Sequence, residues 1–171
     1  MRLHFVDVNP AVTQVLAEAF SAHPEVEILC GDILDHAGHC VVSPANSFGY
    51  MDGGIDAHYS AFFGARLQET VQAAIHRRPE KMLPVGAALA VATGHAIIPF
   101  MIIAPTMEMP EEVPASHAGR AMRAILRLAD AEPLVAEHIY CPGLATLTGR
   151  VPPRDAALSM LEAYEHWKSS K

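Results

Sequence analysis

The sequence predicts an α/β fold of three layers, an α-β-α sandwich in which helices cover both faces of a mixed, mostly parallel sheet. Segments of β-strand composition alternate along the chain with segments whose apolar residues recur at the helical spacing. This alternation is typical of parallel sheets that have helices on both faces. Two strands follow one another directly in the middle of the chain, so the sheet is expected to be mixed.

The expected elements follow in order along the chain. Strands are expected at residues 2–8, 26–29, 40–43, 87–92, 100–104 and 138–141. Helices are expected at residues 11–22, 55–63, 65–76, 116–129 and 152–168, with Ser116 as an N-cap. The pair Asn9-Pro10 ends the first strand, and Pro152 and Pro153 can open the last helix because proline is tolerated in a first helical turn.

Length and composition indicate one domain that covers residues 1–171. The chain is 51% hydrophobic and 18% charged, which is ordinary for a globular protein. Its net charge of −7 and its three lysines argue against long nucleic acid as a partner, because such binding requires clustered Lys and Arg. An anionic ligand remains possible, since helix N-termini and runs of backbone N–H groups bind phosphate without basic side chains.

Cysteine usage and the first residues favour a cytoplasmic protein. Cys30, Cys40 and Cys141 are odd in number and widely spaced, which does not suggest a disulfide framework. Residues 1–6 have the composition of a first strand rather than of a signal peptide. No apolar run approaches the roughly 18 residues that span a bilayer, so no membrane association is expected.

The segment from Asn46 to Asp56 has the composition of a ligand-binding loop. Gly49, Gly53 and Gly54 lie between these two polar residues, and glycine lets a ligand approach the backbone closely. The helix expected next would direct its first N–H groups at the loop. Asp56 is interpreted either as an acceptor for a ligand hydroxyl or a water, or as a helix cap, and the spacing leaves both interpretations open.

Three motifs give the chain a resemblance to the macro domain family. They are Gly31-Asp32-Ile33, Val41-Val42-Ser43-Pro44-Ala45-Asn46-Ser47 and Gly53-Gly54-Ile55-Asp56. The family has Gly-Asp-Ile or Gly-Asp-Val, then Asn-Ala-Ala-Asn-Ser, then Gly-Gly-Gly-Val-Asp in the same order and with matching spacing. A looser similarity covers residues 86–106 and 143–153. The resemblance implies a macro-type fold that binds ADP-ribose or a close relative, without a cofactor or metal.

The resemblance also implies a role for each matching position. Asp32 and Ile33 match residues that contact adenine, Asn46 matches an asparagine that contacts the distal ribose, and Asp56 matches an aspartate that positions or activates water. The other expected substrate-binding residues are Ser47, Gly53, Gly54 and Ile55 in the first loop, and Gly143, Leu144, Ala145, Thr146, Leu147, Thr148, Gly149 and Arg150 in a second phosphate loop. The three segments are expected to form one cleft whose main-chain amides, rather than lysines, neutralise a pyrophosphate.

The chain departs from the family pattern in both loops. Ser43 and Pro44 replace the start of the Asn-Ala-Ala-Asn motif. The second loop lacks the aromatic residue expected near Thr148, and Arg150 either contacts phosphate or points to solvent. The lysine of another catalytic branch has no counterpart, because Lys81 lies outside these loops.

Three functions are compatible with this sequence. The first is hydrolysis of an ADP-ribosyl linkage, on proteins or in O-acetyl-ADP-ribose, with Asn46 and Asp56 as catalytic residues. The second is non-catalytic recognition of ADP-ribose, which the altered second loop favours. The third is binding of another nucleotide diphosphate or of a nucleic-acid end, because a fold does not fix its ligand.

Other candidate residues have structural interpretations that compete with functional ones. His36, His39 and Cys40 are too few for a structural zinc site, which needs four ligands, and a connector into a strand is favoured. His58 could line the site, although a surface or packing role is favoured. Cys141 is expected to be a buried small hydrophobe. The acidic segment at residues 107–114 is interpreted as a surface connection or a mobile lid.

Overall fold

Six strands form a single sheet in the computed structural model, which describes residues 1–171. The strands are β1 (Arg2–Asp7), β2 (Glu27–Cys30), β3 (Cys40–Ser43), β4 (Leu89–Ala92), β5 (Phe100–Ile103) and β6 (His138–Cys141), and their spatial order is β2-β1-β6-β3-β5-β4. All neighbouring strands are parallel except β4 and β5, which form an antiparallel pair. The mixed, mostly parallel sheet predicted from the sequence is therefore confirmed.

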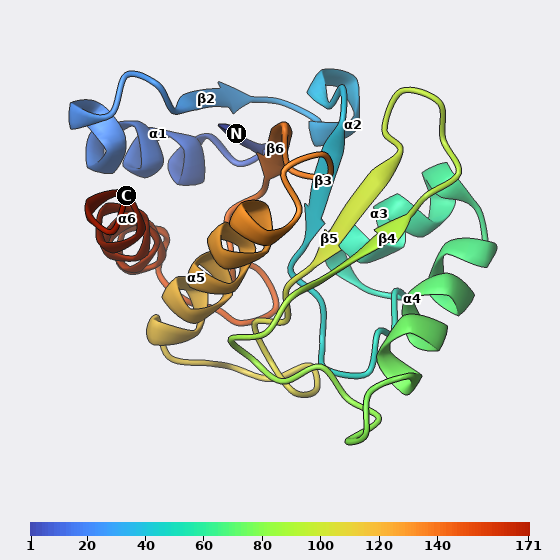
Figure 1. Ribbon diagram of the computed structural model, residues 1–171. Coiled ribbons are helices and arrows are strands. Elements are labelled where there is room, and N and C mark those ends of the chain that lie inside the picture. The colour runs from blue at the N-terminus through green and yellow to red at the C-terminus, as the bar shows by residue number, and fades with distance from the viewer.

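Helices cover both faces of this sheet. They are α1 (Pro10–Ala19), α2 (Ile33–His36), α3 (Gly54–Phe63), α4 (Arg66–His76), α5 (Ser116–Ala131) and α6 (Pro153–Ser169), and a 3-10 turn follows α1 at Phe20–Ala22. Figure 1 shows α1, α5 and α6 together on one face and α3 and α4 on the other. None of the helices combines the length and the hydropathy that crossing a bilayer requires.

The strands supply both layers of the core because successive side chains point to opposite faces of a sheet. In β3, Cys40 and Val42 belong to the larger core cluster beneath α1, α5 and α6, whereas Val41 belongs to the smaller cluster beneath α3 and α4. All three are fully buried. A strand that is covered on both faces has a mostly apolar sequence. For this reason residues 40–43 could be recognised as a strand from the sequence.

Two local expectations differ from the structure. Ser116 is the first residue of α5 rather than its N-cap. The chain already turns just before the helix, because His117 N donates a hydrogen bond to Pro114 O. The N-cap is Ala115, which makes no side-chain hydrogen bond. The four residues of α2 were not predicted as a helix, since a single turn has no apolar periodicity to detect.

The parallel strands bring five loops to one edge of the sheet. The strands β1, β2, β3, β5 and β6 run in one direction, so the residues after each of them lie at the same edge. Ligands of such sheets bind outside the carboxyl ends of the strands. Both glycine-rich loops lie there, because one follows β3 and the other follows β6.

Candidate functional site

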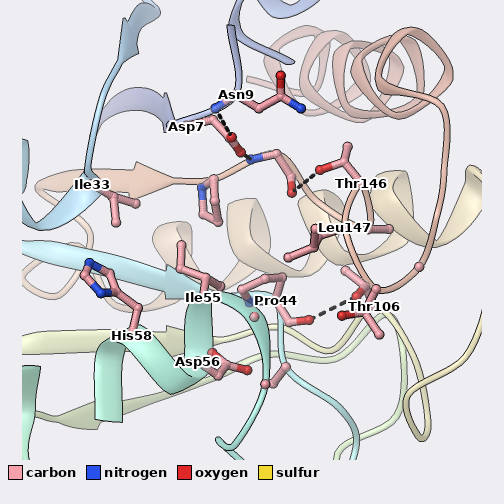
Figure 2. A pocket seen from close by; sticks show the side chains of 18 of the residues that line it. Asp7, Asn9, Ile33, Pro44, Ile55, Asp56, His58, Thr106, Thr146 and Leu147 are labelled. Atoms are coloured by element: carbon pink, nitrogen blue, oxygen red, sulfur yellow. Dashed lines mark hydrogen bonds between the residues drawn. The ribbon is translucent and has the colours of Figure 1, made fainter. Parts of the chain in front are cut away.

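A cavity of about 630 Å³ opens at the carboxyl ends of the strands. It is lined by the turn after β1, the Gly31–Ile33 turn, the loop from Pro44 to Asp56, and the loop from Pro142 to Gly149. Figure 2 shows that segments more than 100 residues apart in sequence surround this one cavity. A volume of this size is within the range for small-molecule and cofactor sites.

The loop from Gly143 to Gly149 presents free backbone amides. The amides of residues 144–149 donate to no protein acceptor, whereas Arg150 N and Val151 N close the loop on Leu147 O and Ala145 O. Ala145 has a φ of 62°, in the left-handed region, which turns the chain sharply at this point. Consecutive unpaired amides in a turn form a concave anion-binding surface.

Asp7 at the end of β1 fixes the start of this loop. Its Oδ2 accepts a hydrogen bond of 3.0 Å from Gly143 N, and its Oδ1 accepts one of 2.9 Å from Asn9 N (Figure 2). Gly143 has no room for a side chain, since a Cβ would lie 2.5 Å from Val12 Cγ1 and 3.1 Å from Asp7 Oδ2. The close approach of two strand ends therefore depends on this glycine.

The first turn of α3 directs another set of free amides at the cavity. The first helical hydrogen bond joins Ala57 N to Gly53 O, so the amides of Gly54, Ile55 and Asp56 have no protein acceptor. Gly54 has a φ of 54°, which a residue without a Cβ adopts at no steric cost. The positive end of the helix dipole adds to the attraction for a negatively charged group.

Asn46 shapes the glycine-rich loop from inside. Its Oδ1 accepts hydrogen bonds from Phe48 N at 3.1 Å and Tyr50 N at 3.2 Å, and its Nδ2 donates to Tyr50 O at 2.8 Å. An amide nitrogen carries two hydrogens, so one donor of Asn46 has no partner within the protein. The side chain lines the cavity and is 8% exposed. Asn46 is thus both a loop-forming residue and a potential ligand donor.

Asp56 is a nearly buried carboxylic acid in the wall of the cavity. It is 7% exposed, and its Oδ1 accepts a hydrogen bond of 2.6 Å from the Ser43 hydroxyl. Burial raises the pKa of Asp56 to about 7, although the hydrogen bond from Ser43 opposes this shift. Asp56 is not the helix cap, because Gly53 occupies that position. A carboxyl group with a pKa near neutrality can accept or release a proton at physiological pH.

Asp32 occupies the N-cap position of α2 in a more open environment. Its Oδ1 accepts a hydrogen bond of 2.9 Å from Leu34 N, and His58 Nε2 lies 2.8 Å from Oδ2 and 3.0 Å from Oδ1. Burial raises the pKa of Asp32, but the hydrogen bonds from Leu34 and His58 outweigh burial and bring the pKa below its usual value. Asp32 is therefore a stable anionic acceptor at neutral pH.

Most of the residues predicted for the site line this single cavity. They are Asp32, Ile33, Asn46, Gly53, Gly54, Ile55, Asp56, Gly143, Ala145, Thr146, Leu147, Thr148 and Gly149. Their convergence agrees with the expectation of one cleft, and the lining contains no Lys or Arg. Its ionisable groups are Asp7, Asp32, Asp52, Asp56, His58 and the phenol of Tyr50.

Three residues predicted to bind substrate lie outside the cavity lining. Ser47 is fully buried, and its hydroxyl donates to Met107 O. Leu144 is fully buried in the larger core cluster, where it anchors the loop to the interior. Arg150 points to solvent, where it forms an exposed ion pair of 3.0 Å with Glu112. Of the two interpretations of Arg150, this position is that of the solvent-exposed side chain.

For several residues that line the cavity, the sequence predicted either no role or a different one. Asp7 was assigned no role in the site, because its contact with Gly143 N follows only once β1 and β6 are known to be neighbours. His58 was favoured as a surface residue, yet it lines the cavity. Thr106, whose hydroxyl donates to Pro44 O, gave no signal at all.

The remaining candidates have structural roles. The segment after β5 is held to both site loops, by Ser47 N to Glu108 O and by Val113 N to Gly149 O. No three His, Cys, Asp or Glu side chains are grouped so as to hold a metal ion. Cys141 is fully buried, and burial raises the pKa of its thiol far above the usual value, which leaves it unreactive.

Comparison with known proteins identifies the family. The family model described as "Macro domain" matches residues 42–160, which is more than half of the chain. The chain belongs to the macro domain family. An uncharacterised protein of Aquifex aeolicus (strain VF5) is 34% identical over 140 residues, which cover 81% of this chain and 79% of that protein.

Solved macrodomain structures share the fold. The Oceanobacillus iheyensis macrodomain with ADP has a TM-score of 0.68 and 19% identity, over 82% of this chain and 75% of that one. Thermosipho africanus DarTG in complex with ADP-ribose has a TM-score of 0.67 and 12% identity, over 95% of this chain and 50% of that one. Both structures place this macro domain chain in the same α/β architecture.

Proposed function

We propose that this macro domain binds ADP-ribose in the cavity and hydrolyses an ADP-ribosyl linkage. The observation that carries the proposal is the position of Asp56, a nearly buried carboxyl group at the end of a helix whose first amides are free. The cavity therefore combines a surface for a pyrophosphate with a group that can handle a proton. Solved macrodomain structures that contain ADP and ADP-ribose support this choice of ligand.

The pyrophosphate would lie between the two sets of free amides. Residues 144–149 supply one set and the first turn of α3 supplies the other, and both line the cavity. Asp32 would accept a hydrogen bond from the adenine amino group, with Ile33 beside it. The distal ribose would then lie against Asn46, Gly53 and Gly54, close to Asp56.

Asp56 would act on the water that attacks the distal ribose. The water oxygen forms a bond to the anomeric carbon, and the bond from that carbon to the leaving group breaks. One water proton passes to the Asp56 carboxylate and is then given to the departing group. This role requires the ionised carboxylate, so turnover is expected to rise with pH through about 7.

Variants of one structural relative replace three residues whose spacing recurs in this chain. The Oceanobacillus iheyensis macrodomain has been solved with an asparagine, a glycine and an aspartate each replaced, the glycine seven and the aspartate ten residues after the asparagine. The glycine variant was solved with ADP-ribose. The same spacing relates Asn46, Gly53 and Asp56 in this chain.

Paired binding and turnover measurements test the proposal. Calorimetry with ADP-ribose is expected to give a Kd near micromolar, about −8 kcal/mol, for wild type and for Asp56→Ala alike. Release of ADP-ribose from protein-linked substrate or from O-acetyl-ADP-ribose is expected to fall at least about 100-fold in the variant. Binding without any release by wild type would instead identify a non-catalytic reader, and the absence of binding heat would overturn both functions.

A further inference from the structure

Ser43 lies behind Asp56 as seen from the cavity. It is the last residue of β3, is fully buried and is absent from the cavity lining, whereas Asp56 is part of that lining. Its hydroxyl donates to Asp56 Oδ1 at 2.6 Å, and this is the one hydrogen bond that the Asp56 side chain accepts. Asp56 Oδ2 has no protein partner and remains available.

The backbone of Ser43 is held rigidly by the sheet. Ser43 is paired with Ile103 of β5, and Ala104 N donates to Ser43 O at 3.0 Å. The neighbouring residue Val42 accepts a hydrogen bond from the Tyr59 hydroxyl of α3, which fixes the helix against the strand. The distance between the Ser43 hydroxyl and Asp56 is therefore set by two packed elements rather than by a mobile loop.

We propose that Ser43 is a positioning residue that holds Asp56 Oδ1 from behind and leaves Oδ2 free for the attacking water. This inference rests on the hydrolase function proposed above. It gives a role to a position where the chain departs from the Asn-Ala-Ala-Asn pattern of the family. A hydroxyl donor also favours the charged form of the carboxylate, which is the form that accepts a proton from water.

Few other groups could replace Ser43 in this role. The first turn of α3 and the 144–149 loop contribute backbone amides, and no Lys or Arg lines the cavity. The other ionisable side chains in the lining are Asp7, Tyr50, Asp32, Asp52 and His58. Tyr59 lies one turn further along α3, and its hydroxyl donates to Val42 O. None of them makes a hydrogen bond with the Asp56 carboxylate, so Ser43 is its single direct donor.

Titration of Asp56 in Ser43 variants tests the inference. The carboxyl carbon of Asp56 is followed by NMR in aspartate-labelled protein, and the pH dependence of kcat and KM is measured on the same samples. Ser43→Ala is expected to raise the midpoint of Asp56 by roughly one pH unit, which lowers kcat about fivefold at pH 7 and restores most of it at pH 9. KM is expected to stay unchanged, because Ser43 does not line the cavity.

Two further variants control for structural damage. Ser43→Cys replaces the hydroxyl with a larger and weaker donor, so its midpoint is expected between those of wild type and Ser43→Ala. Ser60→Ala removes a hydroxyl of the same helix that donates to Met51 O instead, and it is expected to leave the midpoint unchanged. A loss of turnover without this graded shift would indicate damaged packing and would overturn the inference.

The two proposals fail in different ways. If wild type releases ADP-ribose and Asp56 titrates at the same pH in wild type and in Ser43→Ala, the role of Ser43 is overturned and the hydrolase function stands. If wild type releases no ADP-ribose at any pH, the hydrolase function is overturned. The role of Ser43 in that reaction is then overturned as well.

Discussion

Asp32 and Asp56 line the same cavity but lie in opposite environments. The side chain of Asp32 is 35% exposed and lies against His58 and the amide of Leu34, which together keep the pKa of its carboxyl below the usual value. Asp56 is 7% exposed with Ser43 as its donor, and burial raises the pKa of its carboxyl to about 7.

The difference separates recognition from chemistry within one site. A carboxylate that stays ionised is a dependable acceptor for a ligand N–H group, and it gains nothing from changing its protonation state. A carboxyl group whose pKa lies near the working pH can take a proton and give it back. Two identical side chains whose pKa values are pushed apart are thus assigned to different tasks by their surroundings.

The largest expected effect is on stability, through Asp56→Asn. The folded-state pKa of Asp56, about 7, exceeds the ordinary aspartate value of 3.8, so the folded protein binds this proton more tightly than the unfolded chain. The proton on Asp56 stabilises the folded protein fully below about pH 4, and this contribution is lost as pH rises through 7. A difference of about three pKa units corresponds to up to about 4 kcal/mol. Asp56→Asn avoids this loss and is expected to unfold at higher denaturant concentration than wild type at pH 8.

Denaturant unfolding of both proteins at pH 5 and pH 8 measures this effect. The stability difference between variant and wild type is expected to grow by a few kcal/mol between the two pH values. Asp32→Asn is the matched control, since its carboxyl is ionised in both states across this range and should give no growth. If the free energy of unfolding depends on pH equally in wild type and in Asp56→Asn, the proposed difference between the Asp32 and Asp56 carboxylates is overturned.

The next effect is on affinity, through Asp32→Ala. Loss of a charged acceptor for the adenine amino group is expected to weaken ADP-ribose binding roughly 10- to 100-fold, with kcat at saturating substrate close to wild type. Calorimetry measures the ADP-ribose affinity, and steady-state kinetics on the same preparation measure kcat. A fall in kcat with unchanged affinity would reverse the tasks assigned to Asp32 and Asp56.

The sequence was sufficient for the framework of the site but not for its internal contacts. Residues 40–43 and 138–141 were predicted as strands with the bounds that the structure shows, because each is a short segment that ends at a turn beginning with proline. Once these strands are parallel, the loops after them must lie at one edge of the sheet. The shared cavity of the two glycine-rich loops follows from that rule.

The contacts that tune the site depend on packing between distant segments. Asp7 and Gly143 are 136 residues apart, and they meet because β1 and β6 are neighbours. Asp56 and Ser43 are 13 residues apart, yet their contact depends on how α3 lies against β3. The family resemblance implied substrate binding for Leu144 as part of the second phosphate loop. Only the core beneath that loop shows that the leucine points inward.

The smallest expected effect concerns His58→Gln, which tests whether Asp32 needs its histidine partner. The pair is largely exposed, with His58 at 48% and Asp32 at 35%, and exposed ion pairs contribute little. Asp32 also keeps its hydrogen bond from Leu34 N, so its orientation is expected to survive. ADP-ribose affinity should change less than about threefold, comparable to Arg150→Gln, which breaks the exposed pair with Glu112 outside the cavity. A tenfold loss confined to His58→Gln would show that the imidazole itself contacts the ligand, and recognition would then belong to His58 and Asp32 jointly.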